Sequence, residues 1–170
     1  NPEVVFVAFC DLCVSTEADL SSMEAAAQRA GLESFDFQLP IRRDVLKLKR
    51  RAAFRKHGFL LTAEHFVASE KKTPTAVLNA ATLLAEPVSY DALSQLVAKF
   101  GAPNRRDLVG LGVSFAAIAG SDNRPETYDD AHARHVRGDG DLLVISLNDV
   151  RTYAHVPSEA IAMSYTRWIR

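Results

Sequence analysis

A chain of 170 residues is long enough to bury most of its apolar surface in one core, so we expect a single domain over residues 1–170. With 48% hydrophobic and 24% charged residues, the composition excludes a disordered chain, and no uncharged apolar run approaches the roughly 20 residues that a membrane-spanning helix needs. The formal net charge of -1 argues against a nucleic-acid-binding protein, because such proteins are strongly basic.

The N-terminal segment predicts a hairpin of two helices. Asn1-Pro2-Glu3 has the residue types of a helix start, and apolar residues at helical spacing then extend the first helix over residues 2–14. A second start at Ser15-Thr16 leads into MEAAAQRA, which is rich in strong helix formers, and Gly31 is expected to end that helix.

The rest of the chain predicts an antiparallel sheet with one more helix. Alternation in VLKLKRR and the β-suited segments FLLTAEHFVA and TAVLNAATLL indicate a meander after Pro40. Ser89 is expected to cap the helix SYDALSQLVAKF, which Gly101 ends. GVSFAAIAG, LLVISL and AIAMSYTRWI indicate further strands, while PETYDDAHARHV fits either a short helix or a long loop. We therefore predict an α+β fold, in which the helical hairpin packs on a sheet of about five strands.

Cys10 and Cys13 form the strongest chemical motif. A thiol-disulfide oxidoreductase places two thiols at this spacing near a helix N-terminus, where the helix dipole lowers the first pKa. The alternative is that both cysteines lie one turn apart within the helix over residues 2–14 and pack as small hydrophobes, with a strained local disulfide as a third option. A zinc site would need about four ligands, and the chain has no second cysteine pair.

A partial metal motif occurs at DDAHARH. If this segment is helical, Asp129, His132 and His135 could share a face, but further ligands would have to come from distant residues such as His155. A solvated acidic segment is the alternative. We expect neither a bound metal nor another cofactor.

A basic segment lies between Ile41 and His57, where the only acid is Asp44. As a strand, VLKLKR would turn Lys47 and Lys49 to one face and Leu46 and Leu48 to the other, giving a charged side or a protected edge of the sheet. The same charges could instead bind phosphates or an anionic lipid surface. The candidate binding residues are Arg42, Arg43, Lys47, Lys49, Arg50 and Arg51.

The hairpin also resembles a group of small exported proteobacterial proteins of no known activity. That group has a Cys-x-x-Thr-x-x-Asp pattern ending in an Ala-Gly pair, matched here by Cys13, Thr16, Asp19 and Ala30-Gly31. Its later strand and helix resemble VLNAATLLAEPVSYDALSQLVAKFGAP, where the group often has a second cysteine beside the Asn-Ala pair. This chain has Asn79-Ala80-Ala81, so the disulfide that the resemblance implies lacks a partner for Cys13.

The resemblance implies an exported protein, in the periplasm or secreted, although the residues leave a cytoplasmic location open. The chain begins at Asn1 rather than Met, which we interpret as removal of a signal peptide or of a flanking segment. We expect a non-catalytic binding domain with an unknown protein partner. The alternatives are a thiol-disulfide oxidoreductase using Cys10 and Cys13, and a polyanion-binding module using the basic segment.

Overall fold

The computed structural model describes residues 1–36, 46–68, 77–85, 89–100, 114–120, 124–149 and 161–169. Within these ranges the α+β class is confirmed, because helices pack against one antiparallel sheet. The sheet has seven described strands, so the prediction of about five is wrong. Two described α-helices lie outside the hairpin where one was expected, α3 at Tyr90–Val97 and α4 at Tyr128–Arg137. Arg42, Arg43, Gly101 and His155 lie outside the described residues.

The first helix follows the sequence prediction closely. Helix α1, Pro2–Phe9, is capped by Asn1, whose Oδ1 accepts a hydrogen bond of 3.0 Å from the backbone N–H of Glu3. It continues without a break into a π-helical turn, η1, at Cys10–Val14. Together α1 and η1 confirm a helical segment over residues 2–14.

Helix α2, Leu20–Arg29, begins later than predicted. Its cap is Asp19, whose carboxylate accepts a 2.9 Å hydrogen bond from the backbone N–H of Ser22. The hydroxyls of Ser15 and Thr16 instead donate backwards, to the carbonyls of Cys10 and Leu12, and so close the first helix. Gly31 follows α2 with φ +72°, a left-handed conformation that favours glycine, which confirms the predicted stop.

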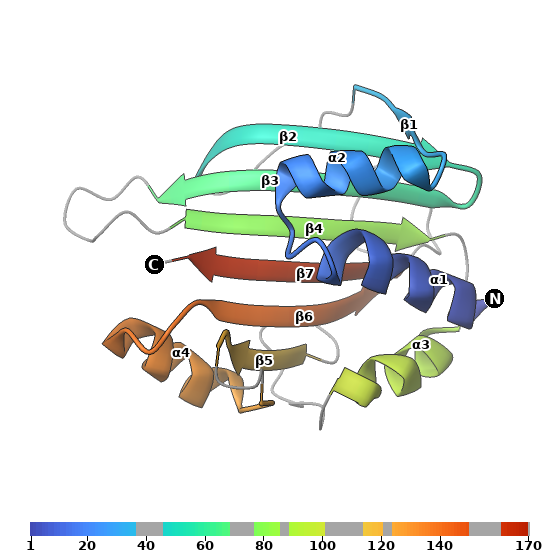
Figure 1. Cartoon of the computed structure of the whole chain (residues 1–170). Helices are drawn as coiled ribbons and strands as arrows, with labels where there is room; N and C mark the ends of the chain where they lie inside the picture. The colour runs from blue at the N-terminus through green and yellow to red at the C-terminus, as the bar shows by residue number, and fades with distance from the viewer. Residues whose placement is uncertain are drawn as a thin grey trace.

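The sheet has the strand order β1-β2-β3-β4-β7-β6-β5, and every neighbouring pair is antiparallel (Figure 1). Strands β2 to β4 form the expected meander. Strand β7, the last described strand in the sequence, lies between β4 and β6 in the interior of the sheet. The strand bounds are β1 Glu33–Ser34, β2 Leu46–Lys56, β3 Phe59–Ala68, β4 Val77–Ala85, β5 Ser114–Ile118, β6 Leu142–Asp149 and β7 Ile161–Ile169.

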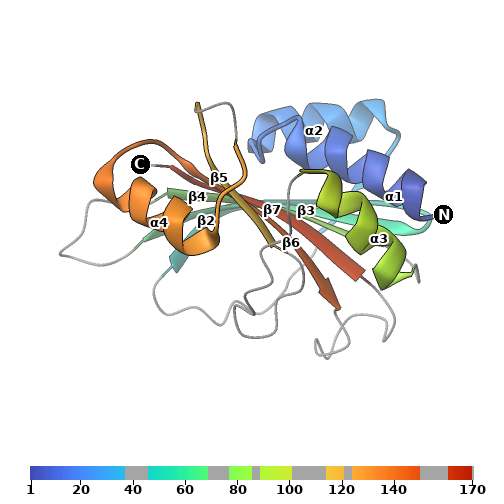
Figure 2. The ribbon, with the colours of Figure 1, turned by 90° about the horizontal axis from the view of Figure 1, so that it is seen from below.

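One face of the sheet carries α1, η1, α2 and α3, as Figure 2 shows. Helix α3, Tyr90–Val97, is capped by Ser89 as predicted and ends in a 3-10 turn, η2, at Ala98–Phe100. The main core lies between these helices and the sheet, and Phe9, Met23 and Leu83 are completely buried in it. None of the described helices has the length and apolar character needed to cross a membrane.

Helix α4, Tyr128–Arg137, packs on the opposite face, so DDAHARH is helical rather than a loop. Successive residues of β5 alternate between the two faces: Phe115 and Ala117 belong to the main core, whereas Ala116 and Ile118 pack with Ala131 of α4.

Candidate functional site

The two cysteines lie in the π-helical turn, well away from the helix N-terminus at Pro2. The backbone N–H of Ser15 donates to the carbonyl of Cys10 at 2.8 Å, the five-residue spacing that defines this turn. Cys10 is half-buried and Cys13 is completely buried, and both are free thiols. η1 packs against β4 and β7, so Cys13 lies in the main core together with Ala81.

The surroundings of both cysteines disfavour the thiolate. Burial raises the pKa of the Cys10 thiol, and the neighbouring carboxylate of Asp11 raises it further. Burial raises the pKa of Cys13 strongly, with an added contribution from Cys10. A nucleophilic cysteine needs a lowered pKa, so this arrangement gives no support to thiol-disulfide exchange.

This leads to a prediction for thiol labelling. At pH 8, native Cys10 should react with a maleimide several-fold more slowly than a free cysteine, because the raised pKa lowers the thiolate fraction at every pH below it. Cys13 should react only after the protein unfolds. The measurement is the labelling rate of the single-cysteine variants C10S and C13S from pH 7 to 10. A native thiol that reacts faster than free cysteine would instead support the redox alternative.

The metal candidates are not brought together. The ring of His132 stacks on Tyr128, with centroids 5.8 Å apart, and Nδ1 of His135 lies 2.8 Å from the carbonyl oxygen of Gly140. His132 and Asp129 are exposed. Among the residues that the structure describes, no three His, Cys, Asp or Glu side chains form a group able to hold a metal.

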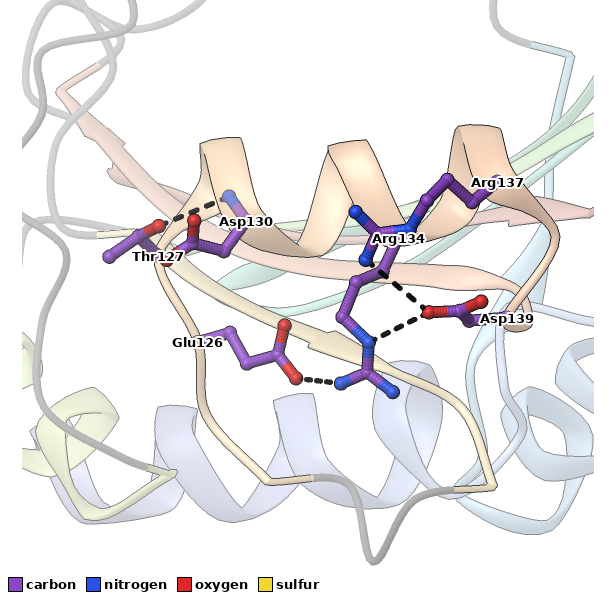
Figure 3. Close-up of polar contacts among 6 residues, drawn as sticks. All are labelled: Glu126, Thr127, Asp130, Arg134, Arg137 and Asp139. Carbon is purple, nitrogen blue, oxygen red and sulfur yellow. Dashed lines mark hydrogen bonds and ion pairs between the residues drawn. The ribbon is translucent and has the colours of Figure 1, made fainter.

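The charged side chains around α4 serve to hold the helix in place (Figure 3). Arg134 binds Glu126 before the helix, and its Nε donates to Asp139 after the helix at 3.1 Å. Thr127 caps the helix by accepting a 3.1 Å hydrogen bond from the backbone N–H of Asp130. Arg137 adds an ion pair of 3.6 Å to Asp139. These contacts fix both ends of α4 and give it a structural role.

The basic segment forms strand β2, which carries six basic residues and no acid. Five of these six are exposed, and we call them the basic stripe: Lys47, Lys49, Arg50, Arg55 and Lys56. The stripe runs along β2. On the side of β2 away from β3, the neighbouring strand β1 pairs with only two residues of β2. Lys47 and Leu48 pair in register with consecutive residues of β3. A register shift between Leu48 and Arg50 then leaves Lys49 without a β3 partner.

The basic residues of β2 differ in their partners. Arg50 pairs with Glu24 of α2 at 2.9 Å, and the less exposed Arg51 pairs with Glu64 of β3 at 2.6 Å. Lys56 donates from Nζ to the carbonyl of Ala30 at 2.7 Å. Within the described part of the chain, no carboxylate pairs with Lys47, Lys49, Arg55 or Lys56. The stripe therefore carries an excess of positive charge.

A shallow depression of about 450 Å³ lies at the end of this strand. It is lined by Gly31, Glu33, Arg55, Lys56 and His57. Sequence reasoning included Arg55 and Lys56 in the basic segment but did not identify this site, because it forms only when the end of α2, strand β1 and the β2–β3 turn meet.

A row of polar side chains was also missed. Arg50, His65, Asn79 and Arg167 are neighbours in register across β2, β3, β4 and β7. Nδ1 of His65 lies 2.6 Å from Oδ1 of Asn79. The strands that carry these residues pair only in the fold, so no local sequence signal could have revealed the row.

Arg167 links this row to the helical hairpin. It contacts Asp141 at 2.7 Å and also pairs with Glu17, in the turn between η1 and α2. Beside it, burial raises the pKa of Tyr165 to about 12, and the nearby charge of Glu17 contributes. One guanidinium here faces two carboxylates, so the arrangement stabilises the hairpin on the sheet and offers no unpaired guanidinium to a ligand.

Comparisons with known proteins gave no match at a significant level among family models, curated proteins or solved structures.

Proposed function

We propose that this protein is a non-catalytic interaction domain that binds an acidic protein surface through the basic stripe. The observation that carries the proposal is the excess of exposed positive charge along β2 in a chain whose formal net charge is -1. From Lys47 to Lys56 the stripe extends about 30 Å, a length that suits contact with another protein. Complementary charge would speed association and select the partner.

An acidic protein fits this surface better than a nucleic acid does. Carboxylates of Glu24 and Glu33 lie beside the stripe, and they would repel a uniform row of phosphates. Within the described residues, the one cation–π contact of the stripe joins Arg55 to Phe35, with the guanidinium carbon 5.3 Å from the ring centroid. Nucleic-acid binders that use a sheet normally present open aromatic rings for base stacking.

The proposal predicts a strong effect of charge reversal. Poly-L-glutamate is a suitable acidic polypeptide probe, and the K47E/K49E variant should bind it at least about tenfold more weakly than the unmodified protein at low salt. Both lysines are exposed and contact no carboxylate among the described residues, so the fold should be retained. Fluorescence anisotropy at several salt concentrations measures the effect.

The matched control is K99E/R124E, which makes the same change in charge at exposed positions near the β5 and β6 side of the molecule. It should weaken binding less than about threefold, because only long-range, screened charge is altered. Equal losses in the two variants would contradict the proposal. Tighter binding of single-stranded DNA than of polyglutamate at the same salt concentration would favour the polyanion alternative.

A further inference from the structure

The end of β2 combines structural elements that are distant in the sequence. The C-terminus of α2, strand β1 and the β2–β3 turn meet at one end of the sheet (Figure 1). The depression of about 450 Å³ between them has a volume typical of a site for a small ligand or for one side chain of a partner. Two cationic side chains, Arg55 and Lys56, line it together with His57 and one acid, Glu33. Because consecutive strand residues alternate in direction, Arg55 and Lys56 reach it from the two sides of the sheet edge.

The ammonium group of Lys56 is positioned by one hydrogen bond, which does not use all of its N–H donors. Its ammonium group donates to the carbonyl of Ala30 at 2.7 Å, where the negative end of the α2 dipole favours a cation. An ammonium has three N–H donors, so two remain for a ligand. A Cβ at Gly31 would lie 3.6 Å from Nζ of Lys56, an ordinary contact distance, so the left-handed φ of +72° favours glycine here and the space beside the ammonium does not require it.

Arg55 is held by a different contact. Its guanidinium lies over the ring of Phe35, with the central carbon 5.3 Å from the ring centroid. This cation–π contact restrains the guanidinium and leaves its edge donors available, and that edge suits two oxygens of one carboxylate or phosphate. Glu33 is the Cα partner of Arg55 across β1 and β2, yet the two side chains form no ion pair within the described structure.

We infer that this depression is an oxyanion-binding site, in which Arg55 and Lys56 bind a carboxylate or phosphate group that His57 flanks. The inference rests on the proposed function, since it identifies the point at which the basic stripe would anchor an acidic group of its partner. Arg55 supplies paired donors from its guanidinium edge. Lys56 supplies its two remaining N–H groups from the end of α2.

The test is a ¹H–¹⁵N NMR titration at constant ionic strength with two probes, inorganic phosphate and an N-acetylated tetraglutamate amide. We expect saturable shifts concentrated at Gly31, Glu33 and residues 55–57. R55Q should weaken binding at least about fivefold, and R55K should fall between R55Q and the unmodified protein, because lysine keeps the charge but loses the paired donors. K56Q is a second variant, which removes the charge and shortens the side chain by one atom, and it should also weaken binding. The probe that saturates at the lower concentration identifies the source of the oxyanion.

The matched control is K47Q/K49Q, which should leave the affinity for either small probe within about twofold. Shifts that grow without saturation, or that spread equally over the whole stripe, would overturn the inference, as would unchanged binding by R55Q. These results are separable from the proposed function. Polyglutamate binding that depends on Lys47 and Lys49 without small-anion binding would remove the site alone, whereas saturable small-anion binding with no effect of K47E/K49E would remove the stripe alone.

Discussion

Phe9→Ala is expected to lower the free energy of unfolding by about 3–5 kcal/mol, the largest effect predicted for a single substitution here. Phe9 ends α1 immediately before the π-helical turn, and its ring is completely buried in the main core. Removing the ring deletes buried apolar surface and leaves a cavity that the rigid sheet below cannot fill. Urea unfolding followed by circular dichroism measures the change.

Val7→Ala is the matched control in the same helix. Val7 is 55% exposed, so its truncation should alter the free energy of unfolding by no more than about 0.5 kcal/mol. Alanine also has the higher helix propensity, which offsets the small loss of contact. Equal stability of the two variants would contradict the described burial of Phe9 between α1 and the sheet.

Arg167→Met is expected to cost about 1–3 kcal/mol of unfolding free energy. The side chains of Arg167 and Asp141 are only 24% and 19% exposed, so water compensates poorly when the guanidinium is removed. Glu17 would also lose its ion pair with Arg167. The turn that carries Glu17 has a left-handed backbone at Glu17 and Ala18, which non-glycine residues adopt at a cost in free energy. Thermal and urea unfolding would measure the loss.

Two further variants make this result specific to the partly buried ion pair. Arg50→Met removes a similar pair with Glu24, but the Arg50 side chain is 55% exposed, so the cost should remain below about 1 kcal/mol. The double variant Arg167→Met/Asp141→Asn should recover part of the loss, because it also removes the charge of the partly buried carboxylate that faced this guanidinium. Equal costs for Arg167→Met and Arg50→Met would contradict this account.

Local signals predicted the elements that depend on neighbouring residues. Asn1 and Ser89 cap helices because a side-chain oxygen three or fewer residues away can accept an orphan N–H, and Gly31 ends α2 through its own backbone freedom. The start at Ser15-Thr16 was wrong because both hydroxyls donate backwards to the first helix, a choice that composition does not reveal. The two residues of β1 are too few to show any periodicity.

Features that depend on strand pairing could not be predicted. Lys47 and Lys49 were recognised as basic positions, but the carboxylate partners of Arg50 and Arg51 come from α2 and β3. The depression at Arg55 to His57 requires α2 to end beside β1. The sequence does not distinguish a helix from a loop at residues 128–137, because Thr127 is an ordinary cap and Ala131 is the only buried residue of α4 among the described core positions.

The position of β7 between β4 and β6 has a consequence for synthesis on the ribosome. Residues 161–169 join β4 to β6, so the nascent chain can pair β2, β3 and β4, and separately β5 and β6, before the two halves of the sheet can be joined. Until then β4 and β6 each present an open edge that could pair with other nascent chains. Chaperones that shield such edges during translation would therefore raise the yield of folded protein.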